Sequence, residues 1–450
     1  MKDKTIVACF TVCMYVLGTI EKVFGLINKI YPISSKLWLV LFVLGLVSSI
    51  IYFFWDKIMG FFIPDMSWRN DGFAYMTIEA RFRDNFNKTG YEFSNSKSND
   101  HYSSFCIEKV MNASDIVKLH PKVNGKNDAE KYRAKLKSLM KKYKVSVNDD
   151  IQYLFANTPF LFAEHYYFYH ILKLYKGGDP WVKVKEESLN KSKKSNRISQ
   201  CINPQKQLNE LINQSVFANS TDLSQTNAKV KNAESNSDGH ISEYIINNLD
   251  EIQSYIADCF NANKTVHIIV DNSGIELISD LILGKYLIDE YKVNVEYHCN
   301  VLPIFVSDAV RKDFDDAIAA IEETNNNIGE KIKEYINLGK ITITPDVFWN
   351  MPFPFKEMPK ELSDKLNAEN VGLIIIKGDL NYRRLVEDKK WPITMNTARR
   401  VKYLKRPKLI LRTLKSNTLL GVDRNTRDEF DKKRPNWKIT GDFGMIQFIK

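Results

Sequence analysis

The stretch that most constrains the fold is HIIVDNSGIELISDL, which begins at His267. Its apolar run ends at Val270 and has the length and composition of a buried β-strand, and a helix pattern follows directly after Asp-Asn-Ser-Gly. A buried strand that leads at once into a helix is typical of a parallel sheet, because parallel strands need crossover connections and are covered on both faces. The turn also places a carboxylate beside an amide at the end of the strand, where open α/β sheets bind ligands.

The same alternation continues to the end of the chain. After a helix expected over residues 241–257, strands are predicted at 266–270, 293–297, 341–344, 371–376, 408–412 and 445–449, and helices at 275–291, at 308–322 and from residue 380. This alternation predicts an α/β domain over residues 241–450, with a three-layer, Rossmann-like, mainly parallel sheet and helices on both faces.

A different composition precedes this domain. Residues 68–240 are predicted to form a helical subdomain, which includes an aromatic-rich, largely buried helix at 159–175. Residues from about 186 to 240 are poor in apolar side chains and rich in Asn, Ser and Lys, which is typical of a solvated loop. Inside this loop, the stretch CINPQKQLNELINQSVF, which begins at Cys201, keeps a helix pattern.

Two apolar runs stand out in the first 67 residues, which are expected to form one or two membrane segments. Residues 37–55 carry no charge, and a membrane-spanning helix needs about 20 such residues. We therefore expect a transmembrane helix there, with a buried core helix as the alternative. The shorter run at 5–20 fits a signal segment, a second span or an interfacial helix. A single span would place the basic residues ahead of it, which predicts that the large domain lies outside, whereas a two-span hairpin gathers basic residues on the cytosolic side. The expected chemistry favours the hairpin, which predicts a membrane-anchored protein with a cytosolic catalytic domain.

Charge and cysteine content limit the partners. The net charge of +10 comes from 64 basic and 54 acidic residues that are scattered among one another, so nucleic-acid binding is not expected. A small anionic substrate fits the basic excess as well. The six cysteines are widely spaced without a CxxC pair, which indicates neither a disulfide framework nor a cysteine zinc site.

Four polar clusters follow predicted strands or open predicted helices. Two are acid-and-amide sets and two carry cations: Asp271-Asn272-Ser273-Gly274 with Glu276, Ser307-Asp308, Lys377-Gly378-Asp379-Leu380-Asn381-Tyr382-Arg383 and Arg412-Thr413-Leu414-Lys415. Carboxylate and amide oxygens suit a hard divalent metal, whereas Lys and Arg suit phosphate. Each cluster alone has an ordinary explanation as a turn, a helix N-cap or a solvated strand end. Their convergence on one sheet predicts a metal-assisted phosphatase.

Seven blocks of the sequence resemble, in the same order, blocks of the damage-control phosphatases, a domain-of-unknown-function family. They are FAYMTIEARF, PFLFAEHYYFYHILKLY, DNSGIELISDLIL, IFVSDAVRKDF, KGDLNYRRL, LRTLKSN and GDFGMIQF. The Arg-Thr-x-Lys motif resembles the mark of subfamily III, which includes the acidic residue methyltransferase 1-like sugar phosphate phosphatases. The resemblance runs from about residue 68 to the end, with departures at Arg83, His165 and His170 that concern the substrate pocket.

The resemblance implies roles for individual residues. It implies that Asp271, Asn272 and Asp308 bind a divalent metal, which is expected to be manganese, with cobalt, nickel or magnesium as alternatives. The catalytic residues implied are Asp271, Asp308, Asp379 and Lys415. The substrate-binding residues implied are Glu164, Glu276, Asp379, Leu380, Asn381, Tyr382, Arg383, Arg412 and Lys415.

The leading functional hypothesis is metal-dependent hydrolysis of reactive sugar phosphates, such as fructose 1-phosphate, in metabolite damage control. Lys415 and Arg383 would offset phosphate charge, and Asp379 or Glu276 would hold or protonate the leaving group. The first alternative is S-adenosylmethionine-dependent methylation of protein glutamate carboxyl groups. The sequence argues against it, because Asp-Asn-Ser-Gly stands where such enzymes have a glycine-rich loop. The second alternative is a non-catalytic sugar-phosphate or metal binder.

Overall fold

The computed structural model describes residues 63–67, 69, 71, 74, 77–91, 101–122, 127–219 and 243–450. A compact unit of the chain spans Pro64–Lys450. The predicted membrane segments at 5–20 and 37–55 lie outside the described residues. Among the helices that are described, none is both long and apolar enough to cross a bilayer. This finding contradicts the predicted membrane-anchored location, which is withdrawn.

A seven-stranded sheet in the order β1-β7-β6-β5-β2-β3-β4 forms the centre of this unit. Its strands are β1 (Glu243–Asn247), β2 (Thr265–Ile269), β3 (Asn294–Cys299), β4 (Ile341–Pro345), β5 (Val371–Lys377), β6 (Lys408–Thr413) and β7 (Phe443–Ile449). All neighbouring pairs are parallel except β6 and β7, which are antiparallel. The prediction of a mainly parallel α/β sheet is therefore confirmed.

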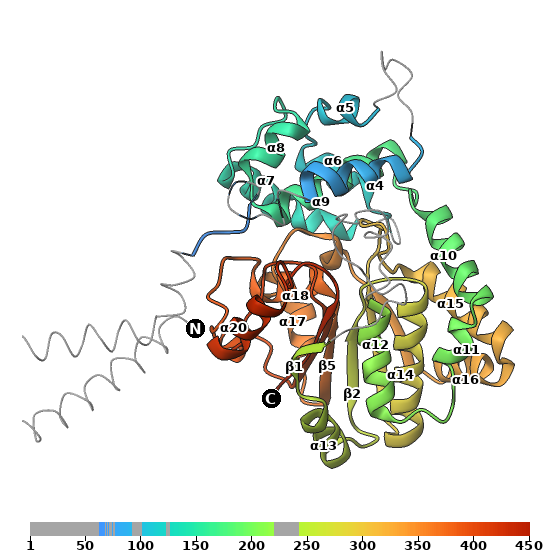
Figure 1. Cartoon of the computed structure of the whole chain (residues 1–450). Helices are drawn as coiled ribbons and strands as arrows, with labels where there is room; N and C mark the ends of the chain where they lie inside the picture. Colours follow the sequence, from blue (N-terminus) through green and yellow to red (C-terminus); the bar gives the residue numbers. More distant parts are fainter. Residues whose placement is uncertain are drawn as a thin grey trace, which may run out of the picture. The chain divides into compact units, whose positions relative to one another are not determined.

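Helices cover both faces of the sheet (Figure 1). The helices α12 (Leu208–Asn219) and α14 (Ile275–Tyr291) lie on one side, and α17 (Lys360–Leu366) and α18 (Asp379–Val386) lie on the other. Every residue of β5 is buried, which explains why its sequence VGLIIIK is apolar at consecutive positions rather than at alternate ones. The apolar core beneath α14 includes Val266 and Ile268 of β2 together with Leu373 and Ile375 of β5.

The strand order reverses between β2 and β5. From β2 the chain proceeds outward through β3 to β4, and it then returns to place β5 on the other side of β2. Because the loops after β2 and β5 therefore run in opposite directions, a crevice forms at the carboxyl ends of these two strands. Asp271 follows β2 and Asp379 follows β5, so both acids lie at this crevice.

Helices from the first half of the unit precede the strands in sequence. They are η1 (Thr77–Arg81), α4 (Phe82–Lys88), α5 (His101–Cys106), α6 (Ala113–Leu119), η2 (Asp128–Tyr132), α7 (Arg133–Lys142), α8 (Ile151–Asn157), α9 (Phe160–Leu174), α10 (Val182–Lys194) and α11 (Arg197–Cys201). The last of these, α11, packs against α14 and α15 (Arg311–Thr324). The aromatic helix α9 is buried along nearly its whole length. Its Tyr169 hydroxyl donates to the carbonyl of Asn350 at 2.6 Å, which joins this helix to a loop of the sheet region.

The remaining elements connect or flank the strands. They are α13 (Leu249–Cys259), α15 (Arg311–Thr324), α16 (Asn326–Asn337), η4 (Val347–Asn350), η5 (Phe355–Glu357), α19 (Thr397–Arg400) and α20 (Arg424–Lys433). Helix α15 packs against α14 and α16, and α13 packs against β7.

Three predicted elements differ from the structure. The helix expected over 241–257 is instead strand β1 followed by α13, because β1 pairs with β7 at the edge of the sheet. The start of the stretch predicted as a loop at 186–240 is helical, and the exposed lysines of α10 make a polar but regular helix there. Helix α15 begins at Arg311, so Asp308 belongs to the preceding loop rather than to the helix start.

Gly284 of α14 provides a test of how tightly this helix contacts the sheet. A Cβ added at Gly284 would lie 2.0 Å from the hydroxyl oxygen of Tyr297. Tyr297 is fully buried, and its hydroxyl donates to the carbonyl of Asp280 at 3.0 Å. We expect Gly284→Ala to lower the free energy of unfolding by about 1–3 kcal/mol through overpacking, as measured by urea denaturation.

Helix propensity alone predicts the opposite sign, since alanine is favoured over glycine inside a helix by about 1 kcal/mol. Adding Tyr297→Phe removes the clashing oxygen and should recover part of the loss caused by Gly284→Ala. If Gly284→Ala costs the same free energy of unfolding with and without Tyr297→Phe, the proposed contact is contradicted.

Candidate active site

A cavity opens at the crevice between the ends of β2 and β5. Its interior has a volume of about 80 Å³, and its mouth is open to solvent. Eight residues assigned to the site from the sequence line this cavity: Glu164, Asp271, Asn272, Asp308, Asp379, Leu380, Arg383 and Lys415. They come from α9 and α18, from the segments that follow β2 and β6, and from the loop before α15.

Backbone pairing holds together the two segments that carry the predicted metal ligands. Asn272 and Asp308 face each other in an isolated antiparallel bridge. The flanking backbone N–H···O=C hydrogen bonds measure 2.7 Å, from Ser273 to Ser307, and 3.0 Å, from Ala309 to Asp271. The segments before α14 and after β3 are thus held side by side by backbone hydrogen bonds, independently of their side chains.

Side-chain hydrogen bonds orient the amide of Asn272. Its Nδ2 donates to Asp271 Oδ2 at 3.0 Å and to Glu276 Oε2 at 2.8 Å. Its Oδ1 accepts from the Ser307 hydroxyl at 2.6 Å. These bonds fix which way the amide faces, so its oxygen is turned toward the Ser307–Asp308 segment.

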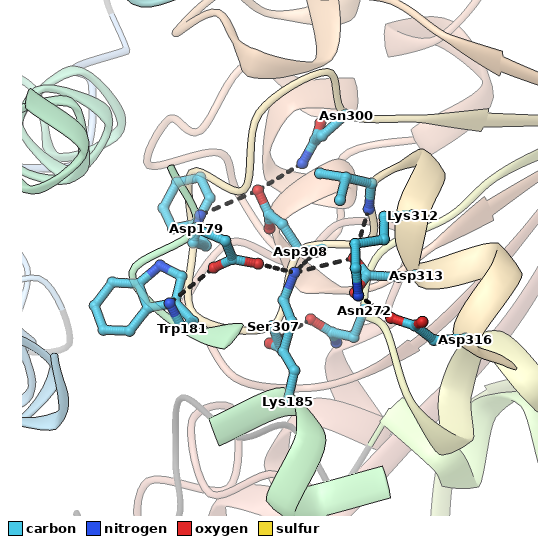
Figure 2. A network of polar contacts seen from close by, with 12 residues as sticks. Asp179, Trp181, Lys185, Asn272, Asn300, Ser307, Asp308, Lys312, Asp313 and Asp316 are labelled. Atoms are coloured by element: carbon cyan, nitrogen blue, oxygen red, sulfur yellow. Dashed lines mark hydrogen bonds and ion pairs between the residues drawn. The ribbon is translucent and has the colours of Figure 1, made fainter. Parts of the chain in front are cut away.

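Asp308 is held from two directions (Figure 2). Its Oδ2 accepts from Asn300 Nδ2 at 2.5 Å and from the backbone N–H of Phe305 at 3.1 Å. Lys185 of α10 donates to the Asp308 carbonyl at 2.8 Å and pairs with Asp313 at 3.0 Å and Asp179 at 3.1 Å. Because a buried ammonium requires several partners, this lysine ties α10 to the loop that carries Asp308.

Gly378 allows β5 to approach Asp271. Its φ of +83° lies in the region that favours glycine. A Cβ at this position would lie 1.9 Å from Asp271 Oδ2. Glycine at position 378 is therefore required by the carboxylate that follows the neighbouring strand, and not only by the turn itself.

Asp379 is anchored by groups from β6 and the loop that follows. Its Oδ1 pairs with the Arg412 guanidinium at 2.9 Å and accepts from the backbone N–H of Lys415 at 3.1 Å. The Arg412 guanidinium also lies 4.1 Å from the centre of the Tyr382 ring. This arrangement keeps Asp379 and Lys415 on the same wall of the cavity.

Arg383 links α18 to the aromatic helix α9. Its guanidinium donates to Glu164 at 2.8 Å and to both carboxylate oxygens of Asp388 at 3.1 and 2.8 Å. Burial raises the pKa of Glu164, and the nearby Arg383 charge opposes that effect. The charge of Arg383 is thus largely offset by two carboxylates, which changes the role expected for it from phosphate contact to support of Glu164.

Four residues assigned to substrate binding do not line this cavity, namely Glu276, Asn381, Tyr382 and Arg412. Glu276 orients Asn272, and Arg412 stacks on Tyr382 while it anchors Asp379. Asn381 Nδ2 donates to the carbonyls of Val270 and Lys377 at 3.1 and 2.9 Å, which ties the end of β2 to that of β5. The structure therefore places these four behind the residues that line the cavity.

The three departures from the family blocks also lie outside the cavity lining. His165 Nδ1 lies 2.7 Å from the carbonyl of Leu161, and His170 Nε2 accepts from the backbone N–H of Met111 at 3.2 Å. Arg83 lies over the ring of Tyr102. Their contacts are those of structural residues, so the departures do not alter the wall of this cavity.

Sequence reasoning did not assign Thr77, Arg81 or Asn85 to the site, although all three line the cavity. Thr77 and Arg81 belong to the quoted block FAYMTIEARF, so their Thr-x-x-x-Arg spacing was the available signal. They are the first and last residues of η1, a π-helix, a form that occurs often at functional sites. Asn300 and Lys185 were also missed, because only the fold brings them to Asp308.

A buried ionic network lies behind Asn272. Lys377 Nζ pairs with Asp280 at 3.1 Å and Glu276 at 3.2 Å, and it donates to Ser215 Oγ at 2.7 Å. Burial raises the pKa of Asp280 to about 6, against the opposing effect of Lys377 and with a further contribution from Glu276. Two carboxylates share one cation in this network. Lys377 holds Glu276 in its orientation behind Asn272, whereas the pKa of Asp280 remains raised.

Two sets of side chains could hold a metal ion. Asp271, Asn272 and Asp308 provide only oxygen donors, which suit a hard divalent cation. Among the described residues, the second set is His267, Glu296 and His298, whose ligand atoms lie within 4.8 Å of one another.

Comparison with known proteins decides the family. The sequence model described as "Damage-control phosphatase ARMT1-like domain" matches residues 105–429, a range that contains all the cavity residues from Glu164 to Lys415. The chain belongs to this family. The family predicted from the sequence is thereby confirmed, whereas its subfamily is not resolved.

Individual relatives align over part of their length. The chain is 29% identical over 256 residues to damage-control phosphatase ARMT1 of Homo sapiens, which covers 53% of this chain and 58% of that protein. It is 33% identical over 191 residues to the Mus musculus protein of the same name, covering 41% and 43%. The chain thus matches about half the length of these curated relatives.

A solved structure was also similar. A duf89 family protein from Pyrococcus horikoshii gives a TM-score of 0.40 at 16% sequence identity, covering 75% of this chain and 94% of that chain. This likeness is too distant to carry details of the site.

Asp280 makes the stability of this damage-control phosphatase family member depend on pH. Because its native pKa is raised from 3.8 to about 6, the native protein keeps a proton that the unfolded chain releases over this range. The contribution of Asp280 to the free energy of unfolding should therefore be present near pH 4 and lost as the pH rises through about 6. Asp280→Asn cannot ionise, so its stability relative to the wild type should increase across this window in urea denaturation.

The exposed Asp258 offers a matched control, and Asp258→Asn should leave the pH profile as it is in the wild type. A profile for Asp280→Asn that runs parallel to the wild type between pH 4 and pH 6 would contradict the raised pKa of Asp280.

Proposed function

We propose that this chain is a metal-dependent phosphomonoester hydrolase that acts on reactive sugar phosphates, such as fructose 1-phosphate, in metabolite damage control. The observation that carries the proposal is the meeting of Asp271, Asn272 and Asp308 with Lys415 around one cavity. Oxygen donors beside a cation are what a metal-assisted phosphatase requires. Membership of the damage-control phosphatase family supports the same reaction.

Asp271, Asn272 and Asp308 are the proposed metal ligands. Manganese is the first candidate, and cobalt, nickel or magnesium would fit the same oxygen donors. When bound, the ion would withdraw charge from the phosphoryl group and help to position the attacking oxygen. Glu276, Ser307 and Asn300 hydrogen-bond to these ligands and hold them in place.

Lys415 and Arg81 are proposed to offset phosphate charge from the wall of the cavity. Lys415 is 5% exposed, so its ammonium acts where water screens charge poorly. Arg383 is assigned a positioning role, because Glu164 and Asp388 already neutralise its guanidinium.

The sugar is proposed to lie beside the phosphate in the same cavity. Glu164 and Asp379 present carboxylate oxygens that can accept hydrogen bonds from hydroxyl groups. Phe82, Phe168 and Phe305 line the same cavity and can cover the apolar face of a sugar ring. A polyhydroxylated phosphate ester matches both surfaces.

Removal of the first ligand tests the reaction. Asp271→Ala should lower phosphate release from fructose 1-phosphate with manganese by about 100-fold or more, because the metal then loses a charged ligand. Colorimetric phosphate detection with the full chain measures this loss. Asp258→Ala, at an exposed position on α13, is the control and should keep wild-type activity.

Undiminished phosphate release by Asp271→Ala would overturn the assignment of roles. Tight S-adenosylmethionine binding in metal-free buffer, together with no phosphatase activity, would favour the methyltransferase instead.

A partner of the ligands should affect the metal rather than the substrate. Asn300 donates to Asp308 Oδ2 at 2.5 Å. Replacing a residue that supports a metal ligand typically lowers metal affinity or activity by about 10–100-fold. We expect Asn300→Ala to raise the manganese concentration that gives half-maximal activity by a factor in this range, with Asn263→Ala as an exposed control.

The same variant distinguishes this role from substrate binding. If Asn300→Ala raises KM for the sugar phosphate at saturating manganese and leaves the manganese dependence unchanged, then Asn300 does not act through Asp308.

A further inference from the structure

A second group of metal-ligating side chains lies within the sheet. His267 is on β2, and Glu296 and His298 are on the neighbouring strand β3, where His267 and Glu296 are register partners. His267 precedes Asp271 by four residues, which is roughly 13 Å along an extended strand. This group is therefore separate from the three oxygen donors.

The strand period gathers these side chains on one face. Adjacent positions on the same strands, Val266, Ile268, Val295 and Tyr297, belong to the apolar core beneath α14. Since side chains alternate between the two faces of a sheet, the intervening His and Glu residues share the opposite face. The alternation of apolar residues with His and Glu on two paired strands thus places three potential ligands together on one face of the sheet.

The distances among the potential ligand atoms approach those of a tetrahedral metal site. His267 Nδ1 lies 2.8 Å from His298 Nε2 and 3.8 Å from Glu296 Oε2, and His298 Nε2 lies 4.0 Å from Glu296 Oε1. Ligands of a tetrahedral zinc ion are about 3.3 Å apart, given bonds of about 2.0–2.1 Å. The imidazoles need to separate by about half an ångström. Because all the ligand atoms lie within 4.8 Å of one another, one carboxylate oxygen needs to approach the two nitrogens by at most about 1.5 Å.

Burial prepares the two imidazoles to act as ligands. His267 is 3% exposed and His298 is fully buried. Burial lowers the pKa of His267 to about 4 and that of His298 to about 3, so both rings are neutral near pH 7. At 2.8 Å the two facing nitrogens share one proton between them. A metal ion would take the place of that proton, which would move to the other nitrogen of its own ring, so both imidazoles would bind as neutral ligands.

Lys365 is the competing cation at this group. Its Nζ donates to Glu296 Oε1 at 2.6 Å, and Thr344 donates to the same oxygen at 2.7 Å. These bonds leave Oε2 as the carboxylate oxygen nearer to His267. The Lys365 side chain is 45% exposed, so it can move toward solvent when a second cation arrives.

We propose that His267, Glu296 and His298 form a structural site for a divalent transition metal, with zinc best matched to two imidazoles and one carboxylate. A metal ion there would join β2 to β3, the strands that lead to Asp271 and Asn300. Glu296 is 14% exposed and provides the side from which the ion and a water ligand can enter. The site stands independently of the proposed phosphatase activity.

Zinc binding to the full chain tests this site. Asp271→Ala removes the oxygen-donor site, and in this background we expect one zinc ion per chain in calorimetry and in elemental analysis after dialysis. Adding His298→Gln should remove that ion. Cobalt should give the visible absorption of a four-coordinate ion in Asp271→Ala and should lose it in the double variant.

Lys365→Met provides a second test that does not disturb the buried histidines. Because it removes the cation that competes for Glu296, it should tighten zinc binding several-fold in the Asp271→Ala background. Zinc should also raise the melting temperature of Asp271→Ala, and raise it further in Asp271→Ala with Lys365→Met.

Three results would overturn the site. They are an unchanged zinc content on adding His298→Gln, no zinc bound by Asp271→Ala, and zinc affinity that does not respond to Lys365→Met. Any of these would make His267 and His298 a simple hydrogen-bonded pair. If Asp271→Ala with His298→Gln fails to fold, the response to Lys365→Met decides the question alone.

Discussion

The backbone bridge between Asn272 and Asp308 is the contact on which the candidate active site depends. It joins the end of β2 to the loop before α15, across an intervening helix and strand. Without this bridge, two carboxylates in one cavity would repel each other, and only a bound cation would hold them together. The backbone hydrogen bonds of the bridge hold the two segments together, so the fold itself opposes the repulsion between the two carboxylates.

The other constraints act on the same point from different elements. Gly378 leaves space for Asp271, Lys185 holds the Asp308 loop from α10, and Lys377 holds Glu276 behind Asn272. Each is buried or lacks a side chain, and each acts at the reversal of strand order. A site supported from several elements is rigid, which is what positioned electrostatic stabilisation of a transition state requires.

Much of the fold could be predicted because its physical signals are local. The central strands are continuous apolar runs, and α14 has the bounds expected from its sequence, Ile275–Tyr291. The prediction of a helix at β1 was wrong because β1 is a short edge strand with one buried residue, and its apolar pattern fits either structure. The antiparallel direction of β7 also depends on tertiary pairing that no local pattern specifies.

The site shows the same limit. The carboxylates after β2 and β5 could be located from the turns that carry them, because strand ends in a parallel sheet meet at one edge. The pairing of Arg383 with Glu164, residues 219 positions apart, could not be predicted from either segment. Without that contact, a buried arginine in a phosphatase is naturally assigned to phosphate. The place of Arg81 in the cavity likewise depends on how η1 meets the sheet.

The most direct test of the central claim is anomalous diffraction from crystals of the full chain grown with manganese. The account predicts an anomalous peak within about 2.0–2.6 Å of oxygen atoms from Asp271, Asn272 and Asp308. If manganese at a saturating concentration gives a peak elsewhere and none beside these three side chains, the account is contradicted.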